Sequence, residues 1–68
     1  MERFDGVNKC EEEFPKVDEF IEAVLDVCKK YGYSIAHEDV HGAFEIHIGY
    51  DEDYAGWLRK AIFYPPKK

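Results

Sequence analysis

The sequence has little of what marks enzymes, membrane proteins and secreted scaffolds. Among its 68 residues it has one serine and two cysteines, and its five glycines are scattered rather than gathered in a phosphate-binding loop. Cys10 and Cys28 are too few for a disulfide framework, so we expect reduced thiols, with Cys28 in the core. No apolar run approaches the ~20 residues of a membrane span, and no signal peptide opens the chain. A soluble, intracellular protein with no catalytic serine is therefore expected.

The sequence is also short of positive charge. Nine Lys and Arg residues stand against fifteen Asp and Glu residues, which gives a net charge of −6. No segment carries the basic stripe that phosphate-backbone binding requires, so direct nucleic-acid binding is not expected. An acidic surface suits a basic groove on another protein, although it often only keeps a protein soluble. With 46% apolar residues, the chain reads as one globular domain over 1–68.

Residues 14–31 carry the clearest pattern, that of an amphipathic helix. Apolar side chains recur at three- and four-residue spacing: Phe14, Val17, Ile21, Val24, Leu25 and Cys28. Pro15 suits the first turn and Gly32 the end. Because Phe20, Ala23 and Val27 widen the apolar face, we expect the helix to be covered by its own sheet and by a second chain. The candidate interface residues are Phe20, Val27 and Tyr31.

Two runs of alternating residues follow, 33–38 and 43–49, and predict a β-hairpin. With Glu38 opposite Ala43, one face of the hairpin is apolar, and a shift by one residue would mix the faces. The predicted pairs on that face are Tyr33 with Ile48, Ile35 with Ile46, and His37 with Phe44. We expect the Asp39 side chain to open the turn and Gly42 to close it with a positive φ.

The two ends of the chain complete an α+β fold class. Asp51 reads as the N-cap of a second helix over 51–63, and 64–68 read as a tail. Residues 1–13 read as a lead-in, with a short strand or turn around 4–7. The expected unit is α-β-β-α. Because a two-stranded sheet leaves both edges open, we expect a homo-oligomer to complete the sheet or the helical core, or the lead-in to add a third strand.

The segment from His37 to His41 matches the zinc-protease motif H-E-x-x-H. That chemistry needs a helix, which places both imidazoles on one face, whereas here the residues fall between two strand-like runs. We therefore interpret the match as fortuitous and expect no enzyme and no cofactor. A weaker metal set of His37, His41 and His47, with Asp39 near it, stays open. In the simpler interpretation, His37 is a half-buried residue, Asp39 forms the turn and His47 is a solvent-facing strand residue.

Aromatic residues are frequent near the helix–strand junctions, at Tyr31, Tyr33, Tyr50, Tyr54, Trp57 and Tyr64. Tyr and Trp suit a protein interface or a nucleobase pocket, or they form a core edge and an oligomer seam. If the chain binds a nucleotide, bases stack on the aromatic rings and nearby cations contact phosphate. The candidate ligand-binding residues are His37, Asp39, His41, Tyr50, Tyr54, Trp57, Arg59 and Lys60.

The strings Ser34-Ile35-Ala36-His37-Glu38-Asp39 and His41-Gly42-Ala43-Phe44, followed by Trp57-Leu58, resemble a group of small phage and prophage proteins. The resemblance covers residues ~20–61. It implies a non-enzymatic protein in the cytoplasm of a bacterial host that counters anti-phage defence. The form we expect first is a sponge that sequesters a nucleotide immune signal. The alternative is an acidic, anti-CRISPR-like inhibitor whose residues 11–13 and 51–53 cover a host nuclease or effector. A metal-dependent hydrolase using His37, Glu38 and His41 is the third hypothesis.

Overall fold

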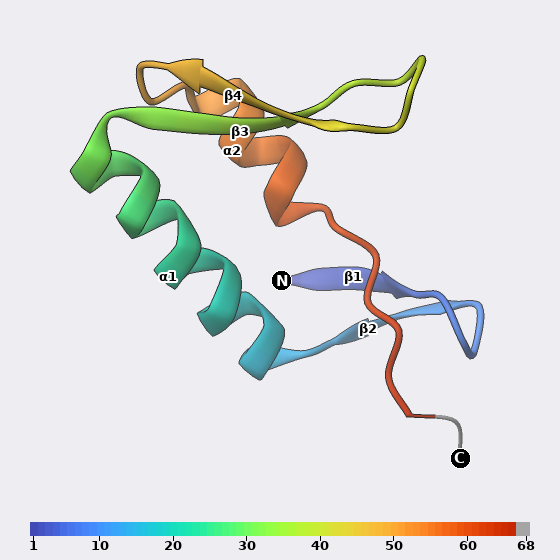
Figure 1. Cartoon of the computed structure of the whole chain (residues 1–68). Coiled ribbons are helices and arrows are strands. Elements are labelled where there is room, and N and C mark those ends of the chain that lie inside the picture. The colour runs from blue at the N-terminus through green and yellow to red at the C-terminus, as the bar shows by residue number, and fades with distance from the viewer. Residues whose placement is uncertain (67–68) are drawn as a thin grey trace.

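The chain folds as two β-hairpins, each followed by a helix (Figure 1). The computed structural model describes residues 1–66. The elements are β1 (Glu2–Asp5), β2 (Cys10–Glu13), α1 (Pro15–Tyr31), β3 (Tyr33–His37), β4 (Phe44–Ile48) and α2 (Glu52–Arg59). The α+β class is confirmed, but the order is β-β-α-β-β-α rather than α-β-β-α.

The expected lead-in is a regular hairpin, which corrects the sequence analysis. β1 pairs with β2 in antiparallel register, from Glu2 opposite Glu13 to Asp5 opposite Cys10. The turn forms because Asp5 Oδ1 accepts hydrogen bonds from the N–H groups of Val7 (2.7 Å) and Asn8 (2.8 Å). This hairpin does not extend the β3–β4 sheet, since each sheet in residues 1–66 has two strands. The third-strand alternative is therefore wrong.

Helix α1 agrees with the predicted helix over 14–31. Pro15 lies in its first turn, and Gly32 ends it in the left-handed conformation (φ 73°), with its N–H bonded to the carbonyl of Cys28 at 2.9 Å. Ile21, Leu25 and Cys28 are buried, and Ile21 and Leu25 form the central cluster with Ala55 of α2. Cys28 is a buried free thiol, as expected.

The register of β3 and β4 is the predicted one, with Tyr33 opposite Ile48, Ile35 opposite Ile46 and His37 opposite Phe44. Gly42 has a positive φ of 72°, as expected. The turn itself is held differently. Glu38, not Asp39, accepts the N–H groups of the turn, and the Asp39 side chain is 98% exposed. Glu38 stands just before the turn and has a longer side chain than Asp39, so its carboxylate can reach the N–H groups of Val40 and His41.

Burial of the β3–β4 sheet is inverted relative to its hydropathy. Ser34 and Ala36 are 2% and 6% exposed, whereas Ile46 is 66% and Ile48 94% exposed. α2 packs against the small residues of β3. The Ser34 hydroxyl fixes this contact, because it donates to the carbonyl of Gly49 and accepts from the N–H of Asp51, each at 2.7 Å. The large apolar side chains of β4 therefore lie on the opposite face of the sheet from Ser34 and Ala36.

Helix α2 is shorter than the predicted 51–63. Asp51 caps it, as expected, by accepting from the N–H of Asp53 at 2.8 Å, but the helix ends at Arg59. The following residues are extended and run beside β1, where Phe63 accepts from the N–H of Gly6 (2.8 Å) and donates to the carbonyl of Phe4 (3.1 Å). The tail expected at 64–68 is described as far as residue 66, and residues 67–68 lie outside the described residues.

Arg3 explains where α2 stops. Its side chain is buried, and Nη1 donates to the carbonyls of Arg59 (2.9 Å) and Ala61 (3.0 Å). Nη2 pairs with Asp18 of α1. One guanidinium thus joins β1, α1 and the end of α2, and it satisfies carbonyls that a longer helix would have used itself.

Replacing Arg3 should cost more stability than replacing an exposed cation. We expect Arg3→Met to lower the free energy of unfolding by about 2–4 kcal/mol, because two carbonyls lose their donor and the Asp18 carboxylate loses its partner. Urea unfolding followed by circular dichroism measures this. Lys30→Met, at an exposed position of α1, is the control and should unfold near the wild-type midpoint. Equal midpoints for both variants would contradict the role given to Arg3.

Asp18 should make the stability depend on pH. The hydrogen bond from Arg3, and then the Met1 ammonium, hold the pKa of Asp18 below its usual range. A lowered native pKa stabilises the fold above the ordinary carboxyl pKa of about 3.9, and this contribution is lost as the pH falls toward the native value. Urea midpoints measured from neutral to acidic pH should therefore fall less steeply for Asp18→Asn than for the wild type. Parallel curves would show that the pair contributes nothing.

Candidate functional site

A row of three rings crosses from β4 to α2. The His47 ring stacks on Tyr54 with centroids 4.9 Å apart and planes at 20°, and Tyr54 meets Trp57 edge to face at 5.3 Å. Tyr54 and Trp57 lie three residues apart on α2 and so project from one side of it. Trp57 is 63% exposed. An exposed indole beside a half-buried phenol forms a flat surface that a ligand can contact.

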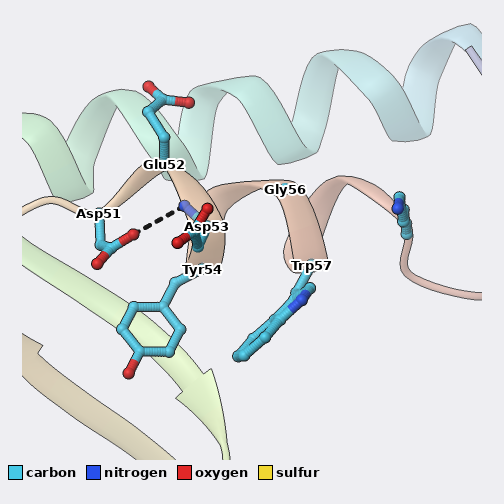
Figure 2. A pocket seen from close by; sticks show the side chains of 7 residues that line it. Asp51, Glu52, Asp53, Tyr54, Gly56 and Trp57 are labelled. Atoms are coloured by element: carbon cyan, nitrogen blue, oxygen red, sulfur yellow. Dashed lines mark hydrogen bonds between the residues drawn. The ribbon is translucent and has the colours of Figure 1, made fainter.

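This aromatic surface borders a cavity of about 400 Å³ along the first turns of α2. Its lining residues are Asp51, Glu52, Asp53, Tyr54, Gly56, Trp57 and Lys60. Figure 2 shows the Tyr54 and Trp57 rings on the same side of the helix and the Asp51 carboxylate turned back to the Asp53 N–H. Three carboxylates and one ammonium make the cavity negative. We call it the acidic aromatic pocket.

A second, smaller cavity of about 140 Å³ lies on the other side of Tyr54 and Trp57. It brings His37 and Phe44 next to these rings, although they come from the hairpin. The His37 and Phe44 rings are 5.7 Å apart. His37 Nδ1 lies 3.5 Å from the Asp39 carboxylate. The structure thus brings together four of the predicted ligand-binding residues, namely His37, Tyr54, Trp57 and Lys60.

Arg59 and Tyr50, which were also predicted to bind ligand, line neither of these two cavities. Arg59 donates through Nε to Glu22 at 2.8 Å and through Nη1 to Glu52 at 3.3 Å. These bonds raise the pKa of Arg59, and Arg59 in turn lowers the pKa of Glu22. The Tyr50 ring packs against the central cluster, with the Lys29 ammonium 5.2 Å from its centroid. Both side chains are engaged inside the protomer.

The H-E-x-x-H match lies at the end of β3 and in the turn, not on a helix. Glu38 accepts from the N–H groups of Val40 (2.5 Å) and His41 (2.7 Å), and these bonds, the His41 bond first, lower its pKa. Its carboxylate also contacts His41 Nδ1 at 3.0 Å. His47 contacts Glu45 at 2.9 Å instead. Among residues 1–66 no three His, Cys, Asp or Glu side chains converge on a metal-sized site.

The predicted interface residues Phe20, Val27 and Tyr31 are all more than half exposed on α1. Phe20 opens onto an apolar cavity of about 340 Å³ between α1, the outer face of the sheet and the end of α2. Around the buried Ile21 it is lined by Phe20, Val24, Ile35, Phe44, Ile46 and Leu58, which we call the apolar wedge. Val27 and Tyr31 line an adjoining cavity of about 180 Å³ that shares Ile35 and Ile46 with the wedge.

Comparison with family models, curated proteins and solved structures finds no match for this chain. Within residues 1–66 no helix has the length and apolar character that crossing a membrane requires. The site is therefore interpreted from its own chemistry.

Sequence reasoning missed the wall of the acidic aromatic pocket. Asp51, Glu52 and Asp53 were interpreted as cap and first-turn residues, which they are, and as part of an acidic face with residues 11–13. The two acidic segments in fact lie apart, at the start of α2 and on β2 (Figure 1). Helical spacing could have predicted this wall, because Asp53 lies about one turn from Gly56 and Trp57 on the same helix.

The protein should hold no structural or catalytic zinc. We expect purified protein to contain far less than one zinc per chain, and EDTA to leave its melting temperature unchanged, because Glu38 and the histidines serve the turn and the strand surface. Elemental analysis together with a thermal melt measures both. His41→Ala is the matched variant and should melt like the wild type in the presence of zinc. A stoichiometric ion that disappears in this variant would restore the metal hypothesis.

Proposed function

We propose that this protein is a non-enzymatic binding protein that recognises a basic surface of another protein. The acidic aromatic pocket carries the proposal. It takes a Lys or Arg side chain of the partner, with the cation against the exposed Trp57 ring and near the Asp51 and Asp53 carboxylates, whereas Glu52 pairs with Arg59. This is the acidic inhibitor that the sequence analysis gave as its alternative, with residues 51–53 at the contact and without residues 11–13.

The charge around the pocket favours a cationic occupant. A cation over Trp gains roughly 0.5–1 kcal/mol at an exposed site and more when it is desolvated. The carboxylates add an attraction that salt weakens, because the pocket is open to solvent. Among the lining residues that the structure describes, Lys60 is the one cation, and it leaves the local balance negative. A phosphate in the same place would face the carboxylates.

The nucleotide sponge is the second candidate, and one observation favours it. Tyr54 and Trp57 offer surfaces on which a base could stack, with His37 and Lys60 on either side. Of the basic residues predicted to contact its phosphate, Arg59 is bonded to Glu22 and Glu52, and His37 lies 3.5 Å from the Asp39 carboxylate. A nucleotide would have to displace these carboxylates, which makes the basic protein surface the better-supported partner.

The resemblance to phage proteins gives the proposal its setting. In that setting the partner is a host nuclease or effector in the bacterial cytoplasm, and its basic surface is the channel that binds nucleic acid. A protein with a net charge of −6 is steered toward such a channel and competes there with the nucleic acid. The proposed role is thus occlusion, without chemistry.

A cationic peptide should bind at the pocket and quench or shift the fluorescence of Trp57, which is the only tryptophan. We expect an oligoarginine peptide to bind, with an affinity that falls as salt is added, and ATP or a cyclic dinucleotide to bind far more weakly. Asp53→Lys should weaken peptide binding about tenfold or more, because it reverses a charge at the pocket wall.

Glu19→Lys is the matched control, since it makes the same charge change at an exposed position of α1 away from the pocket. It should retain most of the peptide affinity. An equal loss of peptide affinity in the two variants would mean that net charge alone drives binding, and it would contradict the proposed role of the pocket. Tighter binding of a nucleotide than of the peptide would establish the sponge instead.

A further inference from the structure

The apolar wedge is an apolar surface that the proposed function does not use. On β4 the apolar residues are exposed and the polar residues between them half-buried, the reverse of an ordinary solvent-facing strand. Phe44 is 76% and Phe20 68% exposed, on two elements that face the same cavity. We propose that the wedge is the interface of a two-fold homodimer, in which the wedge of one copy packs against that of the other.

The size of the chain supports an interface of ordinary dimensions. Its accessible surface is 5283 Å², whereas a folded monomer of 8.0 kDa has about 4,450 Å². The excess of about 800 Å² is spread over the chain and is similar in size to the area that each partner contributes to a standard protein–protein interface. The radius of gyration, 13.1 Å against about 11 Å for a compact chain of this length, indicates the same openness.

Charge favours a second copy as the occupant. The six wedge residues carry no charge, whereas the whole chain carries −6. Two copies repel each other wherever their carboxylates approach, and this repulsion is weakest at a face from which charge is absent. A basic partner would instead be met by carboxylates, which lie outside the wedge.

The free edge of β4 borders the wedge and suits a two-fold axis. Hydrogen bonds join Glu38 to Ala43 and Gly32 to Gly49 at the two ends of the ladder. Bonded and non-bonded pairs alternate in an antiparallel ladder, so the Ile35–Ile46 pair, three steps from each end, is non-bonded. The N–H and C=O of Ile46 therefore point to the outer edge. A two-fold axis near Ile46 would pair β4 with its copy in antiparallel fashion and bring the two wedges into contact along this edge.

Analytical ultracentrifugation of the full chain tests the dimer. We expect a mass near twice 8.0 kDa for the wild type. Ile46→Glu and Phe20→Glu should raise the dissociation constant about 30-fold or more, as the loss of a central hot spot does. Val40→Glu is the control: Val40 is apolar and 83% exposed in the turn, outside the wedge, and its variant should stay dimeric.

Ile48→Lys keeps the test independent of folding defects. Ile48 is 94% exposed on the same strand face as Ile46, so its replacement removes little packing within the protomer, yet it should weaken the dimer while the circular dichroism spectrum is unchanged. A wild-type mass of one chain, or wedge variants that stay dimeric, would overturn the proposal. Peptide binding at the acidic aromatic pocket is read separately, so failure of the dimer and failure of the proposed function are distinguishable.

Discussion

The burial of two small residues of β3 determines which side of the molecule is apolar. Ser34 and Ala36 lie against α2, and the Ser34 hydroxyl joins the carbonyl of Gly49 to the N–H of Asp51. Small side chains let the helix approach the strand closely. Because successive residues of a strand point to opposite faces, this choice turns Ile35, Phe44 and Ile46 to the other side. The wedge, and the oligomer inferred from it, follow from that contact.

A second constraint holds the two ends of the chain together. Arg3 reaches from β1 to Asp18 and to the carbonyls that follow α2, and Phe63 then runs beside β1. These bonds lie among β1, α1 and the segment that follows α2, away from the β3–β4 sheet (Figure 1). The terminal contacts therefore stabilise the protomer and leave the wedge open, so a change in the wedge need not disturb the fold.

The sequence predicted those elements whose spacing of apolar residues is compatible with a single structure. Helix α1 and the register of β3 and β4 follow from the spacing of apolar residues, since a one-residue shift would have mixed the faces. In residues 1–13 only a short strand or turn around 4–7 was expected, and the hairpin was missed because its strands are short and β2 reads as an acidic run. The end of α2 was missed because it depends on Arg3, more than fifty residues away. Local pattern cannot encode such a contact.

The candidate site was predictable in part. The aromatic residues were identified as a contact surface, and Tyr54 and Trp57 do line a cavity with Lys60. The partners of the cations were not predictable, because pairing of Arg59 with Glu22 joins separate helices. Those pairs shift the balance from an anionic ligand to a cationic one.

The most direct measurement of the central claim is an isotope-filtered nuclear Overhauser experiment on a mixture of labelled and unlabelled chains. A wedge that is covered by its own copy gives cross-peaks between the Ile46 methyl groups of one chain and the aromatic protons of Phe20 or Phe44 of the other. A mixture in which these methyl groups show only contacts within their own chain would contradict the account.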